Sequence, residues 1–158
     1  MSAPDTEVYS LLVPLAGSRL IVPRTCVADL MAYKLPAQVP GAPPWYLGTT
    51  GWNGREIPLV SFESMCGEEL PPASSRARVV VFHALLGRLD CEAFGLLVQG
   101  FPQLVRMRAE MLQPDSLYVR PVRAPVLSRV RLLRDGALIP DLEQMEAVIA
   151  DETSVATR

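Results

Sequence analysis

The feature of this sequence that most constrains its fold is a succession of short apolar runs separated by turn-forming residues. This pattern is typical of a many-stranded β protein and not of repeated strand–helix–strand units. We therefore predict a mostly β fold. The predicted strands cover residues 8–15, 19–22, 47–52, 56–61, 78–84, 93–99, 103–107, 117–125, 130–134 and 137–139.

Residues that tolerate positive φ mark three of the turns between these strands. The turns are Ala16–Gly17–Ser18, Asn53–Gly54 and Asp135–Gly136. Asn-Gly and Asp-Gly are favoured pairs in the type I′ turns of β-hairpins. We expect a hairpin at each of the three positions.

Two proline-containing segments separate groups of strands. Four prolines between residues 35 and 44 remove backbone donors and fix φ, which predicts an extended connector. A second connector is expected at residues 68–75. These connectors would divide the strands into two small barrel-like sheets.

Helices are expected at two places. Thr25 can cap a short helix in which Val27, Leu30 and Met31 share a mostly apolar face. Asp141 and the glutamine three residues later have the form of a capping box before a C-terminal helix. Each helix is expected to close an open end of a barrel.

A length of 158 residues fits one domain or two small fused units. We expect disorder at residues 1–7 and 150–158, which are polar and acidic, and a single folded domain at 8–149. The three cysteines lack C-x-x-C spacing, and no basic and apolar leader precedes Val8, which favours a reduced cytoplasmic protein. The apolar runs are far shorter than a membrane span, so we expect no insertion into a membrane.

The chain offers few groups for catalysis or for binding a soft metal. It contains one histidine, one lysine and three cysteines, which limits proton transfer, Schiff-base chemistry and thiolate sites. His83 could combine with Cys66 or Cys91, but their spacing suggests neither a nucleophile nor a metal site. We expect no enzyme activity, no cofactor and no metal, and a cysteine- or metal-dependent enzyme stays open as an alternative.

The net charge of −2 gives no general attraction to nucleic acid. The charge is unevenly spread, since residues 106–134 contain seven arginines and two acids, whereas 135–158 contain six acids and one arginine. A small β-barrel that binds nucleic acid through arginine-bearing sheet faces is therefore an alternative function, although Tyr118 is the only aromatic residue in 103–134. The alternating arginine pairs are Arg76 and Arg78, Arg106 and Arg108, and Arg129 and Arg131.

Three glutamates lie close together around the start of the second connector. Glu68 and Glu69 precede a double proline, and Glu63 is nearby. A loop position of this kind predicts a solvated acidic surface and not a carboxylate site.

Residues 39–62 read VPGAPPWYLGTTGWNGREIPLVSF, and this segment resembles the CheW family of chemotaxis adaptors. That family carries a Pro-x-x-Pro-x-aromatic-x-x-Gly entry, a Gly-Val-x-Asn-Leu-Arg-Gly hairpin and a Pro-Val-x-Asp-Leu strand. The matching positions are Pro40, Pro43, Trp45, Gly48, Gly54, Pro58, Leu59, Val60 and Phe62. The order of the flanking strands and the ending VRLLRDGALIPDLEQM extend the resemblance over residues 8–149.

The resemblance implies a fold of two five-stranded, SH3-like β-barrel subdomains, intertwined in one domain over a shared core. It also implies a scaffold that couples the cytoplasmic tip of a methyl-accepting chemoreceptor to the regulatory domain of a CheA-type histidine kinase. Pairing with other CheW-like proteins is a further option. We expect a divergent member from a type IV pilus chemosensory system, and the sequence leaves open whether the output is twitching or swimming motility.

The resemblance further implies a protein-binding surface. Val27 and Asp29 match receptor-facing positions on the helix that follows the second strand, and Gly48 matches the glycine that enters the hairpin. The family's hairpin arginine is replaced by Asn53, which supplies neither its charge nor its reach. The candidate protein-binding residues are Val27, Asp29, Leu30, Gly48, Trp52, Asn53 and Gly54.

The two tryptophans have different expected roles. Trp52 stands where the family has an aliphatic residue, and tryptophan is enriched in interface hot spots. A half-buried position beneath the hairpin is an equally good interpretation of Trp52. Trp45, behind the double proline, is expected in the core.

Overall fold

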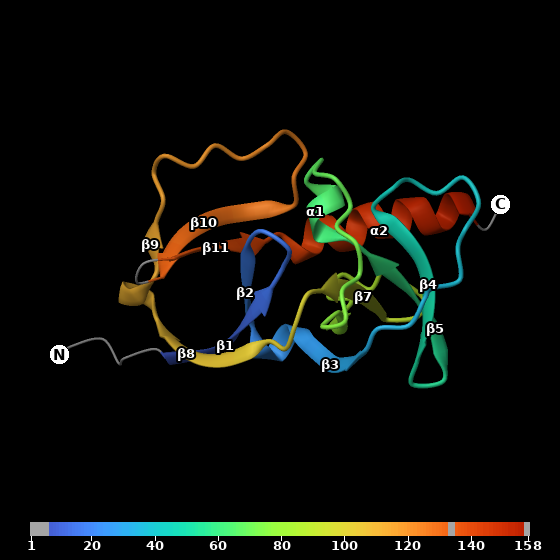
Figure 1. Ribbon diagram of the computed structural model, residues 1–158, viewed down its shortest axis with the longest axis horizontal. Coiled ribbons are helices and arrows are strands. Elements are labelled where there is room, and N and C mark those ends of the chain that lie inside the picture. Colours follow the sequence, from blue (N-terminus) through green and yellow to red (C-terminus); the bar gives the residue numbers. More distant parts are fainter. Residues whose placement is uncertain (1–6, 133–134, 157–158) are drawn as a thin grey trace.

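The apolar runs form two β-sheets in the computed structural model, which describes residues 7–132 and 135–156 (Figure 1). The sheets lie side by side, and the helix α2 (Leu142–Ala156) extends from the end of sheet A toward the far side of sheet B. The predicted mostly β fold is confirmed.

Within the described residues, six strands form sheet A, in the order β8-β1-β2-β11-β10-β9. Their bounds are β1 (Glu7–Pro14), β2 (Arg19–Pro23), β8 (Gln103–Arg108), β9 (Gln113–Pro114), β10 (Val126–Leu132) and β11 (Asp135–Pro140), with the 3-10 helix η2 (Ala109–Met111) between β8 and β9. β2 and β11 pair in parallel at Leu20 and Leu138. Sheet A therefore combines the first hairpin of the chain with its last strands.

Sheet B contains five strands in the same described part of the chain, in the order β3-β6-β7-β5-β4. Their bounds are β3 (Val27–Ala32), β4 (Tyr46–Trp52), β5 (Arg55–Val60), β6 (Arg78–His83) and β7 (Ala93–Val98). The resemblance implied five strands in each sheet, and sheet A gains its sixth from the two-residue strand β9.

A shared hydrophobic core joins the two sheets and α2. Leu20 of sheet A, Phe82 and Phe94 of sheet B, and Met145 of α2 are all fully buried in it. The rings of Phe82 and Phe94 stack with centroids 5.5 Å apart. On β6, the side chains of Val79 and Val81 point to the opposite face from Phe82 and lie in a second core inside sheet B. Residues 79–82 of β6 are buried on both faces of the strand, which explains why they are all apolar.

The C-terminal helix begins where the capping box predicts. Asp141 Oδ1 accepts a hydrogen bond from the Gln144 N–H at 3.0 Å. The expected disorder from residue 150 is wrong as far as Ala156, because Ala150 is buried and α2 continues past it. Glu7, also expected to be disordered, is the first residue of β1, and the expectations for 1–6 and 157–158 lie outside the described residues. No helix in the described ranges is both long and apolar enough to span a bilayer.

The predicted helix after Thr25 is wrong. Only a 3-10 turn, η1 (Arg24–Cys26), forms there, and the following residues form β3, which pairs with β6. Leu30 packs against the shared core, while Met31 packs against the core of sheet B. A strand covered on both faces loses the apolar–polar alternation, and its pattern then resembles one face of a helix.

The predicted strand at 117–125 is also wrong, since this segment is a loop between β9 and β10. Prolines within the segment lack the N–H that a strand ladder needs, and Arg123 has a φ of 66°. The apolar side chains that suggested a strand are instead highly exposed: Leu117 at 83%, Val119 at 84% and Val122 at 92%.

The three predicted hairpins are confirmed as antiparallel strand pairs. In the first, the Leu15 N–H donates to the Ser18 carbonyl at 2.9 Å. In the last, the predicted turn at Asp135–Gly136 is wrong, because both residues belong to β11, and residues 133–134 lie outside the described part. The short helix α1 (Phe62–Met65), which the sequence analysis missed, follows β5 and is capped by Ser61.

Candidate protein-binding surface

Trp52 joins the two edges of sheet B. β3 and β4 are the edge strands of this sheet, yet Trp52 at the end of β4 donates from Nε1 to Asp29 Oδ2 on β3 at 3.0 Å. Asp29 Oδ1 also accepts from the Leu30 N–H at 2.8 Å, which orients the carboxylate. The hydrogen bond thus closes the sheet toward a barrel.

The sequence supports two interpretations of Trp52, either a contact residue at the surface or a half-buried residue beneath the hairpin, and its exposure is compatible with both. The indole is half-buried and packs against the core of sheet B, whereas Asp29 is exposed. A large ring is therefore held in place by the fold while part of it faces solvent. Such fixed aromatic groups lose little conformational entropy on binding a partner.

The tip of the hairpin is a two-residue turn with the geometry that Asn-Gly favours. Asn53 has a φ of 51° and Gly54 a φ of 75°, and both are exposed. Positive φ at both central residues matches a type I′ turn. We call Asp29, Trp52, Asn53 and Gly54 the hairpin surface.

Gly48 does not belong to the hairpin surface. It is buried on β4 with a φ of 137°, and a Cβ at this position would collide with the Ala37 carbonyl of the proline-rich connector. Ala37 and Thr49 exchange two backbone hydrogen bonds of 2.9 Å each. Glycine at this position therefore lets the connector pair closely with β4, and a side chain would displace it.

Val27 and Leu30 lie on β3 but are only partly available to a partner. Both are half-buried, and both pack against the shared core. Asp29 lies between them on the strand, at an irregularity in the β3–β6 register. The exposed parts of Val27 and Leu30 flank the carboxylate of the hairpin surface along β3.

A hollow of about 440 Å³ lies beside the hairpin surface. Trp52, Asn53 and Arg55 line it from the hairpin, and His83 and Glu92 line it from the region of the β6–β7 loop. Arg55 donates to the Cys91 carbonyl at 3.2 Å and pairs with Glu92 at 3.4 Å. Sequence reasoning missed this contribution, because only the fold brings the β6–β7 connection next to the hairpin.

The comparisons with known proteins agree with this architecture. A model of the CheW-like domain matches residues 10–148. The chain belongs to the CheW-like domain family. Protein PilI from Pseudomonas aeruginosa is 28% identical to it over 110 residues, which cover 68% of this chain and 60% of PilI. The matched segment thus spans less than two thirds of that relative.

A solved CheW structure shows the same fold. The scaffolding protein TtCheW from Thermoanaerobacter tengcongensis aligns with a TM-score of 0.71 at 15% identity, covering 85% of this chain and 89% of that chain. The prediction from the sequence that this chain is a divergent CheW-like protein is therefore confirmed.

The proline and aromatic residues of the CheW motif serve the fold. The Tyr46 N–H donates to the Pro43 carbonyl at 3.0 Å, which turns the connector into β4. Trp45 is half-buried against the shared core, with its ring 5.8 Å from that of Tyr46. Its carbonyl accepts from the Ser61 N–H at 2.9 Å and so holds the end of β5. These proline and aromatic residues position the hairpin of this CheW-like chain without belonging to the hairpin surface.

Two thiol groups of this CheW-like chain, those of Cys26 and Cys66, are poorly suited to nucleophilic chemistry. Burial, with the nearby carboxylates of Glu68 and Glu63, raises the pKa of Cys66 to about 12, and burial raises the pKa of Cys26. The thiolate is the reactive form of cysteine. In the part of the chain that the structure describes, no three His, Cys, Asp or Glu residues are placed to hold a metal. His83 is exposed and lies in the hollow beside the hairpin.

The arginine-bearing faces are partly occupied by contacts within the chain. The guanidinium groups of Arg78, Arg106 and Arg129 lie over the rings of Phe101, Tyr9 and Tyr118 at 4.6, 5.5 and 5.9 Å. Arg108 pairs with Glu7 at 3.2 Å, and Arg129 pairs with Asp115 at 3.6 Å. These aromatic faces are covered by arginine, whereas nucleic-acid surfaces use free rings for base stacking.

Proposed function

We propose that this chain is a non-enzymatic cytoplasmic adaptor that links a methyl-accepting chemoreceptor to the regulatory domain of a CheA-type histidine kinase. Its membership of the CheW-like family supports this role, because members of the family are scaffold proteins. The observation that carries the proposal for this chain is the Trp52–Asp29 pair, which fixes an aromatic ring and a carboxylate at the surface of sheet B.

The setting we propose is a type IV pilus chemosensory system. The similarity to Protein PilI over 110 residues supports it. In such an array the adaptor would hold receptor and kinase at a fixed distance, and its two sheets around one core give the stiffness that this requires. Pairing with other CheW-like proteins would extend the same array.

We propose that the receptor tip binds the hairpin surface together with the exposed parts of Val27 and Leu30. A helical receptor tip would pack apolar side chains on the indole and place a donor near Asp29. Asn53 replaces the family's hairpin arginine, so recognition here depends on the ring and on one carboxylate. Gly48 acts indirectly, by letting the connector hold β4 in place.

The test is a calorimetric titration of the purified chain with the cytoplasmic tip of a chemoreceptor from the same organism. Trp52→Ala is expected to weaken binding by about 30-fold, the effect of losing a hot spot of about 2 kcal/mol. Val27→Glu should also weaken binding, because it places a charge beside Asp29. The matched control is Val122→Glu, the same change at a highly exposed valine on the far loop of sheet A.

Melting curves of each variant separate a loss of binding from a loss of fold. If Trp52→Ala and Val27→Glu are folded and bind the receptor tip as tightly as the parent, the proposed surface is wrong.

A further inference from the structure

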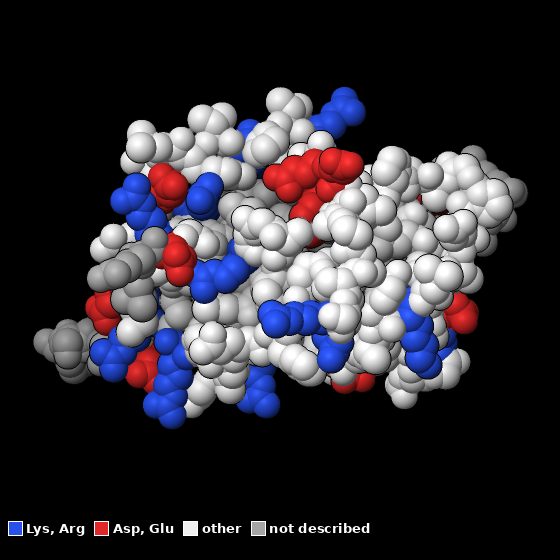
Figure 2. Space-filling view, viewed as in Figure 1, with Lys and Arg blue, Asp and Glu red and all other residues white. Residues whose placement is uncertain are grey.

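The second connector borders a cleft of about 650 Å³ between α1 and sheet A. Glu63, Cys66 and Glu68 line it from the α1 side, and Arg19, Tyr118 and Arg129 line it from the sheet A side. Figure 2 shows acidic side chains gathered at the region of α1, with basic side chains toward sheet A. The expectation that Glu63 belongs to a solvated surface is wrong, since its side chain is only 4% exposed.

Glu63 is buried with half of its hydrogen-bonding capacity unused. Its Oε2 accepts from the Ala16 N–H at 3.3 Å. Its Oε1 is buried and has no hydrogen-bond partner among the described residues. Burial raises the pKa of Glu63, the backbone N–H groups of Glu63 and Ala16 act in the opposite direction without cancelling the shift, and the nearby carboxylate of Glu68 raises it further. A buried carboxylate oxygen without a donor costs free energy that a bound donor would recover.

The cations that line the cleft already form ion pairs with aspartates. Arg19 lies 3.5 Å from Asp135, and Arg129 lies 3.6 Å from Asp115. In the described ranges, neither Glu63 nor Glu68 forms an ion pair with a basic residue. The α1 side of the cleft therefore carries negative charge that no described cation of the chain neutralises.

We propose that this cleft binds a primary ammonium group at the end of an alkyl chain, namely a lysine side chain of a polypeptide partner. Only one oxygen of Glu63 is free, which suits a single N–H donor, whereas the fork of an arginine needs both oxygens. Leu15, Phe62 and Leu138 line the same cleft and offer apolar contact to the alkyl stem. This inference is independent of the receptor site, because the hairpin surface lies on other strands.

The probe for this site is Nα-acetyl-lysine N-methylamide, added to the full ¹⁵N-labelled chain at pH 7 while amide chemical shifts are recorded. Saturable shifts are expected at Ala16 and Gly17, next to Glu63. The neutral norleucine analogue should cause no saturable shift, and the arginine analogue should bind at least several-fold more weakly. 1,5-Diaminopentane tests whether the ammonium group that binds the cleft belongs to a free amine and not to a lysine side chain.

The deciding variant is Glu63→Gln, which keeps the side-chain shape and an acceptor for Ala16. It should weaken binding of the lysine derivative by about tenfold or more, as expected for a lost charge-assisted hydrogen bond. Glu56→Gln, at an exposed position on β5, is the matched control and should bind like the parent.

Four results would overturn the proposal. They are no saturable shift with the lysine derivative, equal shifts with the norleucine analogue, equal affinity for the arginine analogue, or unchanged affinity in a folded Glu63→Gln variant. Tenfold tighter binding of diaminopentane than of the lysine derivative would overturn the claim that the ammonium group belongs to a polypeptide partner. The norleucine comparison uses only the parent chain, so it decides the matter even where a variant fails to fold.

Discussion

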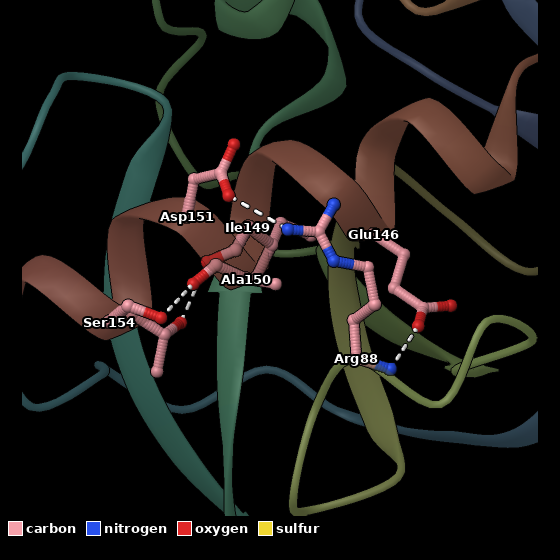
Figure 3. Close-up of polar contacts among 7 residues, drawn as sticks. Arg88, Glu146, Ile149, Ala150, Asp151 and Ser154 are labelled. Carbon is pink, nitrogen blue, oxygen red and sulfur yellow. Dashed lines mark hydrogen bonds and ion pairs between the residues drawn. The ribbon is translucent and has the colours of Figure 1, made fainter.

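Glu146 and Glu63 are both buried glutamates, 1% and 4% exposed, but their surroundings differ. Glu146 on α2 accepts from the N–H groups of Leu86 and Arg88 at 2.8 and 2.9 Å. Figure 3 shows the contact with Arg88, whose guanidinium also pairs with Asp151 at 2.9 Å. Both oxygens of Glu146 are thus used by the chain, whereas Glu63 leaves one unused.

This contrast separates a structural carboxylate from one that can receive a ligand. Glu146 fixes the loop between β6 and β7 to α2, and that loop borders the hollow beside Trp52. Its cost of burial is offset within the molecule. Glu63 lies at a cleft and its cost of burial is only partly offset, so a donor from outside can still add to stability.

The largest effect on stability is expected at Glu146, whose two carboxylate oxygens both accept hydrogen bonds. Glu146→Ala should lower the free energy of unfolding by about 2 kcal/mol, because the N–H groups of Leu86 and Arg88 lose their acceptors. Urea denaturation measures the change. Glu143→Ala, an exposed glutamate of the same helix, is the control. Equal stabilities for the two variants would remove the structural role of Glu146.

A smaller effect of opposite sign is expected at Glu63. The raised pKa means that the folded state favours the protonated acid, so the parent loses stability as the pH rises from the ordinary glutamate value of 4.5 through the folded pKa. Glu63→Gln avoids this loss and should be more stable than the parent at pH 7, by on the order of 1 kcal/mol. The advantage should shrink toward pH 4.5 and be absent below it.

Urea denaturation at several pH values measures this advantage, with Glu56→Gln as the control. A Glu63→Gln variant that is less stable than the parent at pH 7 would mean that the carboxylate is fully satisfied and the contrast with Glu146 is false.

The smallest effect is expected at Cys66, whose thiol reports on the acidic side of the cleft. Glu68→Gln should lower the pKa of Cys66 slightly and speed its alkylation by iodoacetamide, because a repelling carboxylate is removed. The gain should be modest, since burial is the largest cause of the raised pKa. Mass spectrometry of the modified cysteines follows the rate, and an unchanged rate at Cys66 would show that Glu68 carries no charge near it.

Local sequence signals predicted the parts of the fold that depend on neighbouring residues. The Asn53–Gly54 turn and the Asp141 cap each rest on contacts within three residues, and both form as expected. The apolar runs located most of the strands for the same reason, because a strand with one or both faces buried is marked by its own apolar residues.

The errors occurred where distant segments decide the structure. β3 is a strand because it pairs with β6, about 50 residues later in the sequence. Glu63 is buried because the first turn of the chain, at Ala16, covers it, and no local pattern indicates that contact. The Trp52–Asp29 hydrogen bond likewise joins residues 23 positions apart. The family resemblance placed both residues in one surface, but only the fold shows that they touch.

The most direct test of the adaptor role is a pull-down from the source organism with the immobilised full chain, followed by identification of the retained proteins by mass spectrometry. We expect a CheA-type histidine kinase and a chemoreceptor to be retained by the parent, and the receptor to be lost with Trp52→Ala. Retention of neither kinase nor receptor by the folded parent chain would contradict the proposed function.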